Sequence, residues 1–288
     1  MRFLHCSDVH ITQNYRTAPF FKLGWRRWLA MFELTIGGRG RGYRDAGRTL
    51  RRIVGDVERH QADHLIISGD LTAYATEAEF RDVRDALGDF GKSRANCSVI
   101  PGNHDFFTPN SLRTSRFDQH FGHLLESDLP EYRREGPYPF VHFKGDDVAI
   151  VGLLSARVVP LPGMAYGRVG AAQLSGLRDL LDDHRMKHRA VLVLVHHGPL
   201  MANGRRDSRM HGLVDGEELL AMLPGPRFGL LHGHLHERYH HPATARRPHT
   251  FCAGSSTQRG HEGYWLIDVD DGVIRGGTIH MPDLSPAR

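Results

Sequence analysis

The sequence contains little cysteine, and its three cysteines are far apart. Cys6, Cys97 and Cys252 are odd in number, and none belongs to a C-x-x-C pair. This pattern argues against a disulfide framework and against a zinc site built from thiolates. We therefore expect the protein to work in a reducing compartment, which favours a cytoplasmic location.

Long apolar runs are also missing. The longest aliphatic stretches, such as residues 190–195, have about six or seven residues, whereas a membrane-spanning helix needs about 18. The first residues carry no apolar segment of the length that a secretion signal has. The sequence therefore predicts neither a transmembrane helix nor a signal peptide.

The rest of the composition is typical of a globular protein. The 288 residues are 40% hydrophobic and 24% charged, and 21 of them are histidine, which is a common metal ligand. This length fits one large α/β domain or about two smaller ones. We expect one domain over residues 1–288, with an insertion at about 13–43 and a short tail after 281.

Short apolar runs predict strands, and segments with 3.6-residue periodicity predict helices between them. The expected strands are near residues 2–6, 64–68, 97–101, 138–143, 147–153, 190–196, 228–232, 249–253, 263–268 and 273–280. The expected helices cover residues 44–60, 76–90, 110–121, 170–185 and 215–223. This alternation predicts parallel strands in the first half, and the closely spaced strands of the second half predict more antiparallel pairing.

Five short polar clusters follow predicted strand ends. They are Asp8-Val9-His10, Gly69-Asp70, Gly102-Asn103-His104-Asp105, His196-His197-Gly198-Pro199 and Gly233-His234-Leu235-His236. Ligands bind at the carboxyl ends of strands in α/β sheets. Side chains two residues apart point to the same face of an extended backbone, and the glycines permit sharp turns. The clusters are therefore expected to converge.

The clusters offer a mixed set of nitrogen and oxygen donors without any thiolate. Two aspartates, one asparagine and four histidines suit Mn, Fe or Zn better than Ca or Mg. Seven side chains are too many for one tetrahedral ion, but they suit two divalent ions that share a carboxylate. Asp70 is the natural bridge, together with a hydroxide or water.

These five blocks, complete and in this order, resemble the calcineurin-like metallophosphoesterase family over about residues 2–268. The resemblance implies an α/β fold, a four-layer αββα sandwich of two mixed β-sheets. It also implies two metal sites, one on Asp8, His10, Asp70 and His236 and the other on Asp70, Asn103, His196 and His234. His104 matches the catalytic histidine of the family, which contacts the phosphate and protonates the leaving oxygen. His196 matches the ligand better than His197, but the sequence alone leaves that choice open.

The implied function is a dinuclear metal-dependent phosphohydrolase, in the first place a phosphodiesterase. A metal-bridging hydroxide would attack phosphorus in line, and His104 would protonate the departing alkoxide. The blocks resemble the branch with bacterial cyclic-nucleotide and glycerophosphodiester phosphodiesterases. A UDP-diacylglucosamine-type lipid pyrophosphate hydrolase is an alternative, although that group usually has arginine at the position of His104. A non-catalytic scaffold with this fold is another, although the complete ligand set favours an enzyme.

Other enzyme motifs fail on spacing or context. Residues 236–240 spell H-E-x-x-H, a zinc-protease motif that works only on a helix, but they lie between Gly233 and Pro242 without a helical pattern. Gly91-Lys92-Ser93 matches the end of the phosphate-binding motif G-x-x-x-x-G-K-[ST], but Ala86 occupies the position of its first glycine. No G-x-S-x-G nucleophile elbow is present.

The insertion at 13–43 combines aromatic and basic residues. Phe21, Trp25, Trp28, Leu29, Phe32 and Ile36 have helical spacing, with Lys22, Arg26 and Arg27 between them. Such a segment, at about 20–36, either contacts a lipid surface or packs on the protein's own core. Arg39 and Arg41 in the glycine-rich stretch after it, and His197, are candidate substrate contacts. The stretch lacks the aromatics of a single-strand platform, so we expect no specific nucleic-acid partner.

Overall fold

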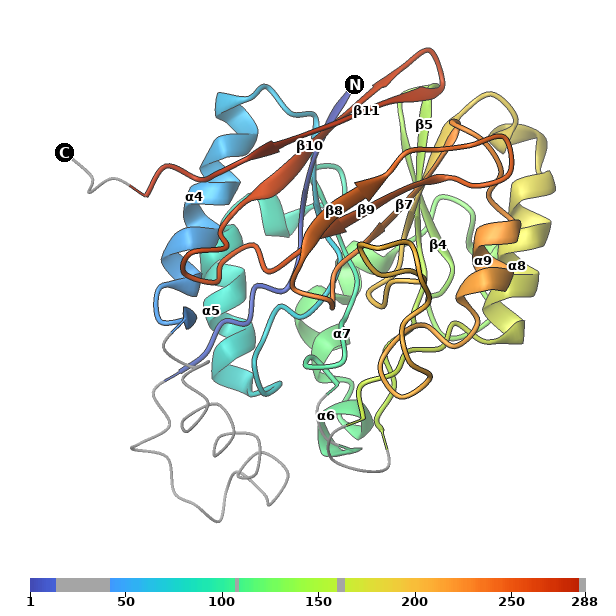
Figure 1. The fold of residues 1–288 in the computed structure, drawn as a ribbon. Helices are drawn as coiled ribbons and strands as arrows, with labels where there is room; N and C mark the ends of the chain where they lie inside the picture. The colour runs from blue at the N-terminus through green and yellow to red at the C-terminus, as the bar shows by residue number, and fades with distance from the viewer. Residues whose placement is uncertain (14–41, 107–108, 160–163, 285–288) are drawn as a thin grey trace.

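The computed structural model describes residues 1–13, 42–106, 109–159 and 164–284 of the chain (Figure 1). The strands are β1 (Arg2–Cys6), β2 (His64–Ile67), β3 (Cys97–Val99), β4 (Phe140–Lys144), β5 (Val148–Gly152), β6 (Ala190–Leu194), β7 (Phe228–His232), β8 (Arg238–His241), β9 (His249–Ala253), β10 (Tyr264–Asp270) and β11 (Val273–His280). The α-helices are α4 (Ala46–Arg59), α5 (Glu77–Leu87), α6 (Pro109–Arg113), α7 (Arg116–Phe121), α8 (Ala171–Asp182) and α9 (Gly216–Ala221).

The strands form two mixed sheets. The five-stranded sheet has the order β11-β10-β1-β2-β3, and the six-stranded sheet has the order β4-β5-β6-β7-β9-β8. In the first sheet β1, β2 and β3 are parallel, while β10 runs antiparallel to both β1 and β11. In the second sheet β5, β6, β7 and β9 are parallel, and only the outer strands β4 and β8 are antiparallel to their neighbours.

Helices cover the outer face of each sheet, so the layers follow the order αββα. Figure 1 shows α4 and α5 on one side of the strands and α8 and α9 on the opposite side. Strand β6 shows how the layers are packed, because its alternate residues face opposite ways. Leu192 and Leu194 belong to the core between the sheets, whereas Val191 and Val193 belong to the core under α8 and α9. The expected fold class is confirmed.

Local sequence explains where helix α5 begins. In α5, the Thr76 side chain accepts a hydrogen bond from the Glu79 backbone N–H, and the Glu79 carboxylate accepts one from the Thr76 N–H. This capping box satisfies two backbone donors at the start of the helix. The buried side chains Phe80, Val83 and Leu87 then follow with helical spacing and fix the helix against the sheet.

Three expectations from the sequence are wrong. The helix expected over residues 110–121 is two short helices, α6 and α7, separated where Ser115 has a left-handed backbone with φ of 47°. Strand β8 was not expected. The second half is less antiparallel than predicted, because α8 and α9 connect β5 to β6 and β6 to β7 as crossovers that return the chain in the same direction.

Most of the insertion expected at 13–43 lies outside the described residues, and so do Arg39 and Arg41. No helix in the described part of the chain is long and apolar enough to cross a membrane.

Candidate metal centre

The predicted ligands lie in loops that follow strands of both sheets. Asp8 and His10 follow β1, Asp70 follows β2, and Asn103 follows β3 in the five-stranded sheet. His196 follows β6, and His234 and His236 follow β7 in the six-stranded sheet. Because all of these strands end at the same edge, the loops of the two sheets meet there.

The two-residue spacing of the ligands predicted an extended backbone in these loops, but the backbone is not extended. Left-handed backbone, with φ between 49° and 72°, occurs at Asp8, His10, Asp70, His234 and His236. This conformation is uncommon for residues other than glycine, although Asp and His adopt it more readily than most. The pairs Asp8/His10 and His234/His236 therefore converge because both residues of each pair have left-handed backbone. The prediction that an extended backbone aligns them is wrong.

The glycines beside the ligands allow close approach, as expected. A Cβ on Gly102 would lie 2.1 Å from Asp70 Oδ1, and a Cβ on Gly233 would lie 2.1 Å from Asp8 Oδ2. Gly69 has a φ of 107°, and its Cβ would lie 2.5 Å from His196 Nδ1. Any side chain at these positions would push the ligand loops apart.

The first group of ligands consists of Asp8, His10 and His236 beside Asp70. His236 Nε2 lies 3.2 Å from His10 Nε2 and 3.3 Å from Asp8 Oδ1. His10 Nε2 lies 3.8 Å from Asp8 Oδ1 and 3.7 Å from Asp70 Oδ2. Neighbouring ligand atoms of one ion with bonds of about 2.1 Å lie roughly 3.0–3.5 Å apart, so this spacing fits a shared ion with small adjustments.

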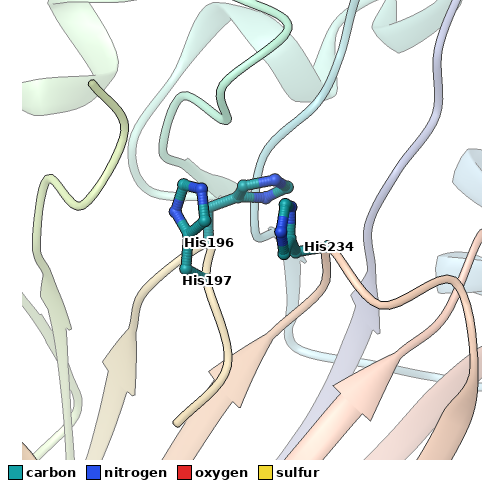
Figure 2. Close-up of side chains that lie close together, drawn as sticks. All are labelled: His196, His197 and His234. Atoms are coloured by element: carbon teal, nitrogen blue, oxygen red, sulfur yellow. The ribbon is translucent and has the colours of Figure 1, made fainter. Parts of the chain in front are cut away.

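The second group consists of Asp70, Asn103, His196 and His234. Asn103 Oδ1 lies 3.2 Å from His196 Nε2 and 3.1 Å from His234 Nδ1, and His196 Nε2 lies 3.3 Å from Asp70 Oδ2. Figure 2 shows the rings of His196 and His234 close together at the strand ends, with His197 beside them. Of the two adjacent histidines, His196 is thus the one that faces Asn103 and Asp70.

Backbone carbonyls orient the imidazoles of the second group. His196 Nδ1 lies 2.8 Å from Ser68 O, and His234 Nε2 lies 3.0 Å from His211 O. A carbonyl only accepts, so these nitrogens donate, and in the neutral rings His196 Nε2 and His234 Nδ1 carry lone pairs. Both lone pairs face Asn103 Oδ1, which is also an acceptor, and such a cluster of acceptors fits a bound cation.

Asp70 belongs to both groups. Its Oδ2 faces His10 on one side and His196 on the other, and its Oδ1 accepts a hydrogen bond from the His104 backbone N–H at 2.8 Å. This placement fits the bridging role predicted from the sequence. The residues present therefore fit two divalent ions that share the Asp70 carboxylate, and their donor types suit Mn, Fe or Zn.

The charge balance also favours cations. Burial lowers the pKa of His10 to about 3, so this imidazole is neutral at pH 7. Burial alone would lower the pKa of His196 too, but the charge and hydrogen bond of Asp70 raise it to about 9. Burial opposes ionisation of Asp70, yet the surrounding histidines hold its pKa well below the usual range. Because a ligating imidazole must be neutral, metal binding would release the His196 proton.

Asp105 joins two ligand loops. Its buried carboxylate accepts hydrogen bonds from the backbone N–H groups of Leu71, Thr72 and Gly102 and from the Thr72 hydroxyl, at 2.8–3.1 Å. Burial and the neighbouring Asp70 raise its pKa to about 6. Asp105 therefore ties the loop after β2 to the loop after β3.

His104 lies beside the first group. A ring nitrogen of His104, a ring nitrogen of His10 and a carboxylate oxygen of Asp70 all lie within 4.8 Å of one another. Its Nδ1 lies 2.8 Å from Ala73 O and donates to this carbonyl. Nε2 is then the nitrogen that would hold or move a proton at this site.

His197, a candidate substrate contact, is not open to solvent. His197 is fully buried, with Nδ1 2.9 Å from Ser155 Oγ and no hydrogen-bond partner for Nε2 among the described residues. A substrate would reach it only if neighbouring parts of the chain moved.

The H-E-x-x-H residues 236–240 run from a loop into strand β8 rather than along a helix, which confirms that this is no zinc-protease motif.

Several neighbours of the ligands carried no signal in the sequence. The Tyr43 hydroxyl contacts His236 Nδ1, Ser255 Oγ and Gln258 Oε1, and the His211 ring lies 4.3 Å from that of His234 between centroids. These residues come from loops without a recognisable spacing relative to the ligands. Only the folded chain brings them to the site.

Comparisons with known proteins agree with this geometry. The sequence model of the calcineurin-like phosphoesterase family matches residues 1–238. The 3′,5′-cyclic adenosine monophosphate phosphodiesterase CpdA of Escherichia coli K12 is 29% identical over 181 residues, which are 62% of this chain and 56% of that protein. A probable cyclic nucleotide phosphodiesterase of Pseudoalteromonas sp. is 26% identical over 65% of this chain and 61% of its own length. The chain thus spans little more than half the length of these relatives.

Solved structures share the fold. A dimetal phosphatase from Danio rerio superposes with a TM-score of 0.63 at 15% identity, covering 98% of this chain and 99% of its own. A purple acid phosphatase from yellow lupin superposes with a TM-score of 0.56 at 11% identity, covering 96% of this chain and 53% of its own. With the family match over most of its length and the ligand loops of both sheets in place, the chain belongs to the calcineurin-like phosphoesterase family.

Proposed function

We propose that this protein is a dinuclear metal-dependent phosphohydrolase that acts on phosphodiesters. One observation carries the proposal: Asp70 Oδ2 lies between two sets of ligands, and His104 stands beside it. Buried carboxylates and imidazoles in such a cluster would be costly without an ion to neutralise and order them. A cluster built only for stability would not need a histidine held next to the bridge.

The residues would divide the reaction between them. The two ligand groups would hold two divalent ions, which would supply a positive centre for the phosphate and lower the pKa of bound water toward about 7. The shared carboxylate of Asp70 would fix the spacing between the two groups of ligands. Asp105 connects the two loops that carry Asp70 and His104. The Ala73 carbonyl accepts a hydrogen bond from His104 Nδ1 and fixes the ring, so that Nε2 of the doubly protonated imidazolium would donate a proton to the leaving oxygen.

The preference for a diester is supported by the relatives. CpdA and the Pseudoalteromonas protein are both named as cyclic nucleotide phosphodiesterases, and they are 29% and 26% identical to this chain over 62% and 65% of its length. We therefore propose cyclic nucleotides as the first substrates to test, with other small phosphodiesters next. The metals we propose are Mn, Fe or Zn.

The test combines metal analysis with a panel of substrates. The purified protein is analysed for bound metal, loaded with Mn²⁺, Fe²⁺ or Zn²⁺, and assayed on an aryl monoester, an aryl diester, a cyclic nucleotide and a sugar-nucleotide lipid pyrophosphate. We expect two ions per chain and fastest hydrolysis of a diester. Asp8→Ala should abolish activity, whereas Glu237→Gln, in the exposed part of the H-E-x-x-H stretch, should leave it unchanged.

Other results would overturn the proposal. Hydrolysis of the lipid pyrophosphate alone would favour the lipid pyrophosphate hydrolase instead. Two bound ions without hydrolysis of any phosphate ester would favour a non-catalytic scaffold. Loss of activity in Glu237→Gln with full activity in Asp8→Ala would contradict the ligand assignment.

A further inference from the structure

A tyrosine outside the predicted ligand set contacts the first group of ligands. Tyr43 is buried, with only 6% of its surface exposed. Its hydroxyl oxygen lies 3.3 Å from His236 Nδ1, 2.8 Å from Ser255 Oγ and 3.1 Å from Gln258 Oε1. Its ring also meets that of His10 edge to face, with 5.0 Å between centroids and an angle of 70°. Tyr43 therefore touches both imidazoles of the first group.

The hydrogen bonds of Tyr43 decide which ring nitrogen of His236 carries the lone pair. A tyrosine hydroxyl has one proton. Gln258 Oε1 only accepts, and Ser255 Oγ donates its own proton to Asp8 O, so the Tyr43 proton lies toward these two oxygens. The Tyr43 oxygen then accepts from His236 Nδ1, which must carry the hydrogen. The lone pair of the neutral ring is left on Nε2, the atom that faces His10 and Asp8.

We propose that Tyr43 is a positioning residue that holds His236 in the tautomer and orientation needed to bind the first metal ion. The inference rests on the metal sites of the proposed function and adds a residue that they do not include. Partners of this kind, one contact removed from the ion, fix ring orientation and raise the basicity of the ligand.

The two groups differ in how their imidazoles are oriented. In the second group His196 and His234 meet backbone carbonyls, which no substitution of one side chain removes. In the first group the side chain of Tyr43 is a partner of His236. The Tyr43 hydroxyl also contacts Ser255 Oγ, which donates to Asp8 O in the ligand loop at 3.0 Å. The first ion should therefore be the one sensitive to this network.

The test uses Tyr43→Phe, which removes the hydroxyl and keeps the ring against His10. The matched control is Tyr264→Phe, because Tyr264 is also buried and its hydroxyl donates to Asp56 Oδ2 at 2.9 Å, away from the ligands. Dissociation constants for Zn²⁺ and Mn²⁺ are measured by chelator competition, and folding is checked by circular dichroism and thermal unfolding of the metal-free proteins. We expect Tyr43→Phe to weaken one of the two ions by about 10–100-fold and leave the other unchanged.

A double-mutant cycle assigns the effect to His236. Tyr43→Phe should add no further loss of metal affinity in a His236→Ala background, because the partner that it orients is already gone. The inference is overturned if Tyr43→Phe binds both ions as the wild type does, if Tyr264→Phe loses the same affinity, or if the effects of Tyr43→Phe and His236→Ala add. A wild-type protein that binds fewer than two ions would instead contradict the proposed function.

Discussion

At the scale of single residues, the atoms around each ligand decide which of its own atoms faces an ion. Ser68 O and His211 O take the hydrogens of His196 and His234, and in the first group the Tyr43 oxygen takes that of His236. Neutral imidazole has one donor and one acceptor, so a fixed donor leaves the other nitrogen as the lone pair. The ligand set is therefore oriented before any ion arrives.

The role of His104 leads to a prediction at this scale. His104→Ala removes the nitrogen proposed to donate a proton, but it leaves the backbone N–H that bonds to Asp70 Oδ1. We expect the turnover rate to fall about 10²–10⁴-fold with metal content unchanged, as is typical for loss of a general acid. Steady-state kinetics and elemental analysis on the same preparation measure both quantities.

The control for this prediction is His184→Ala, because the His184 side chain is 83% exposed. It should retain wild-type turnover. An unchanged rate in His104→Ala would refute the assigned acid, and loss of metal along with turnover would make His104 a ligand instead.

At the scale of elements, the site depends on loops that approach each other at glycines. Gly102 lies between the loop of Asp70 and the ligand Asn103, and a Cβ there would lie 2.1 Å from Asp70 Oδ1 and 2.4 Å from Asp70 N. Asp105 accepts three hydrogen bonds from the loop that carries Asp70 and a fourth from Gly102 N–H in its own loop, and so ties the two loops together. The loops can therefore neither separate nor accept a side chain between them without moving Asp70.

Gly102→Ala tests this close approach. The added methyl group must displace Asp70, so we expect loss of both metal affinity and activity, and a loss of about 1–3 kcal/mol in the free energy of unfolding from overpacking. Urea unfolding and metal titration measure the two effects.

Gly55→Ala is the matched control, because Gly55 lies within α4 and nothing stands within 4 Å of its added Cβ. Alanine favours the helix, so this variant should gain about 0.5–1 kcal/mol and keep full activity. Normal metal binding in Gly102→Ala would show that the loops have room that the structure does not indicate.

At the scale of the whole molecule, the candidate metal centre draws its residues from both sheets. Asp8, His10, Asp70 and Asn103 come from loops of the five-stranded sheet, and His196, His234 and His236 come from loops of the six-stranded sheet. Bound ions would therefore link the two halves of the sandwich, and the ions bind only when both sheets are in place. Metal binding should be coupled to folding.

Removal of metal should lower the stability of the whole protein. At free metal of 100 times the dissociation constant, each occupied site adds about 2.7 kcal/mol to the free energy of unfolding. We expect the melting temperature to fall after treatment with a chelator and to return when Zn²⁺ or Mn²⁺ is added back, measured by calorimetry.

Asp70→Ala is the control for this effect, since Asp70 belongs to both groups. Its melting temperature should respond little to metal. An equal response in Asp70→Ala would show that the ions act at another place on the protein.

What the sequence alone determined is the kind of chemistry and the fold class. The five clusters, each after an apolar run, predicted the ligand types and the strand ends on which they stand, and their resemblance to a known family implied the layered α/β fold. Strand and helix signals are local, because they depend on alternation and capping within one segment, as in α5 with Thr76 and Glu79. Such features can be read before the chain folds.

Only the tertiary structure decided how the clusters become a site. Three features depend on atoms from distant parts of the chain: the left-handed backbone at Asp8 and His236, the contacts of His196 with Asp70 and Asn103, and the contact of Tyr43 with His236. The break at Ser115 and the parallel order of β5, β6, β7 and β9 were likewise hidden. Long-range packing and hydrogen bonds select among local conformations of similar energy, and no single segment carries that information.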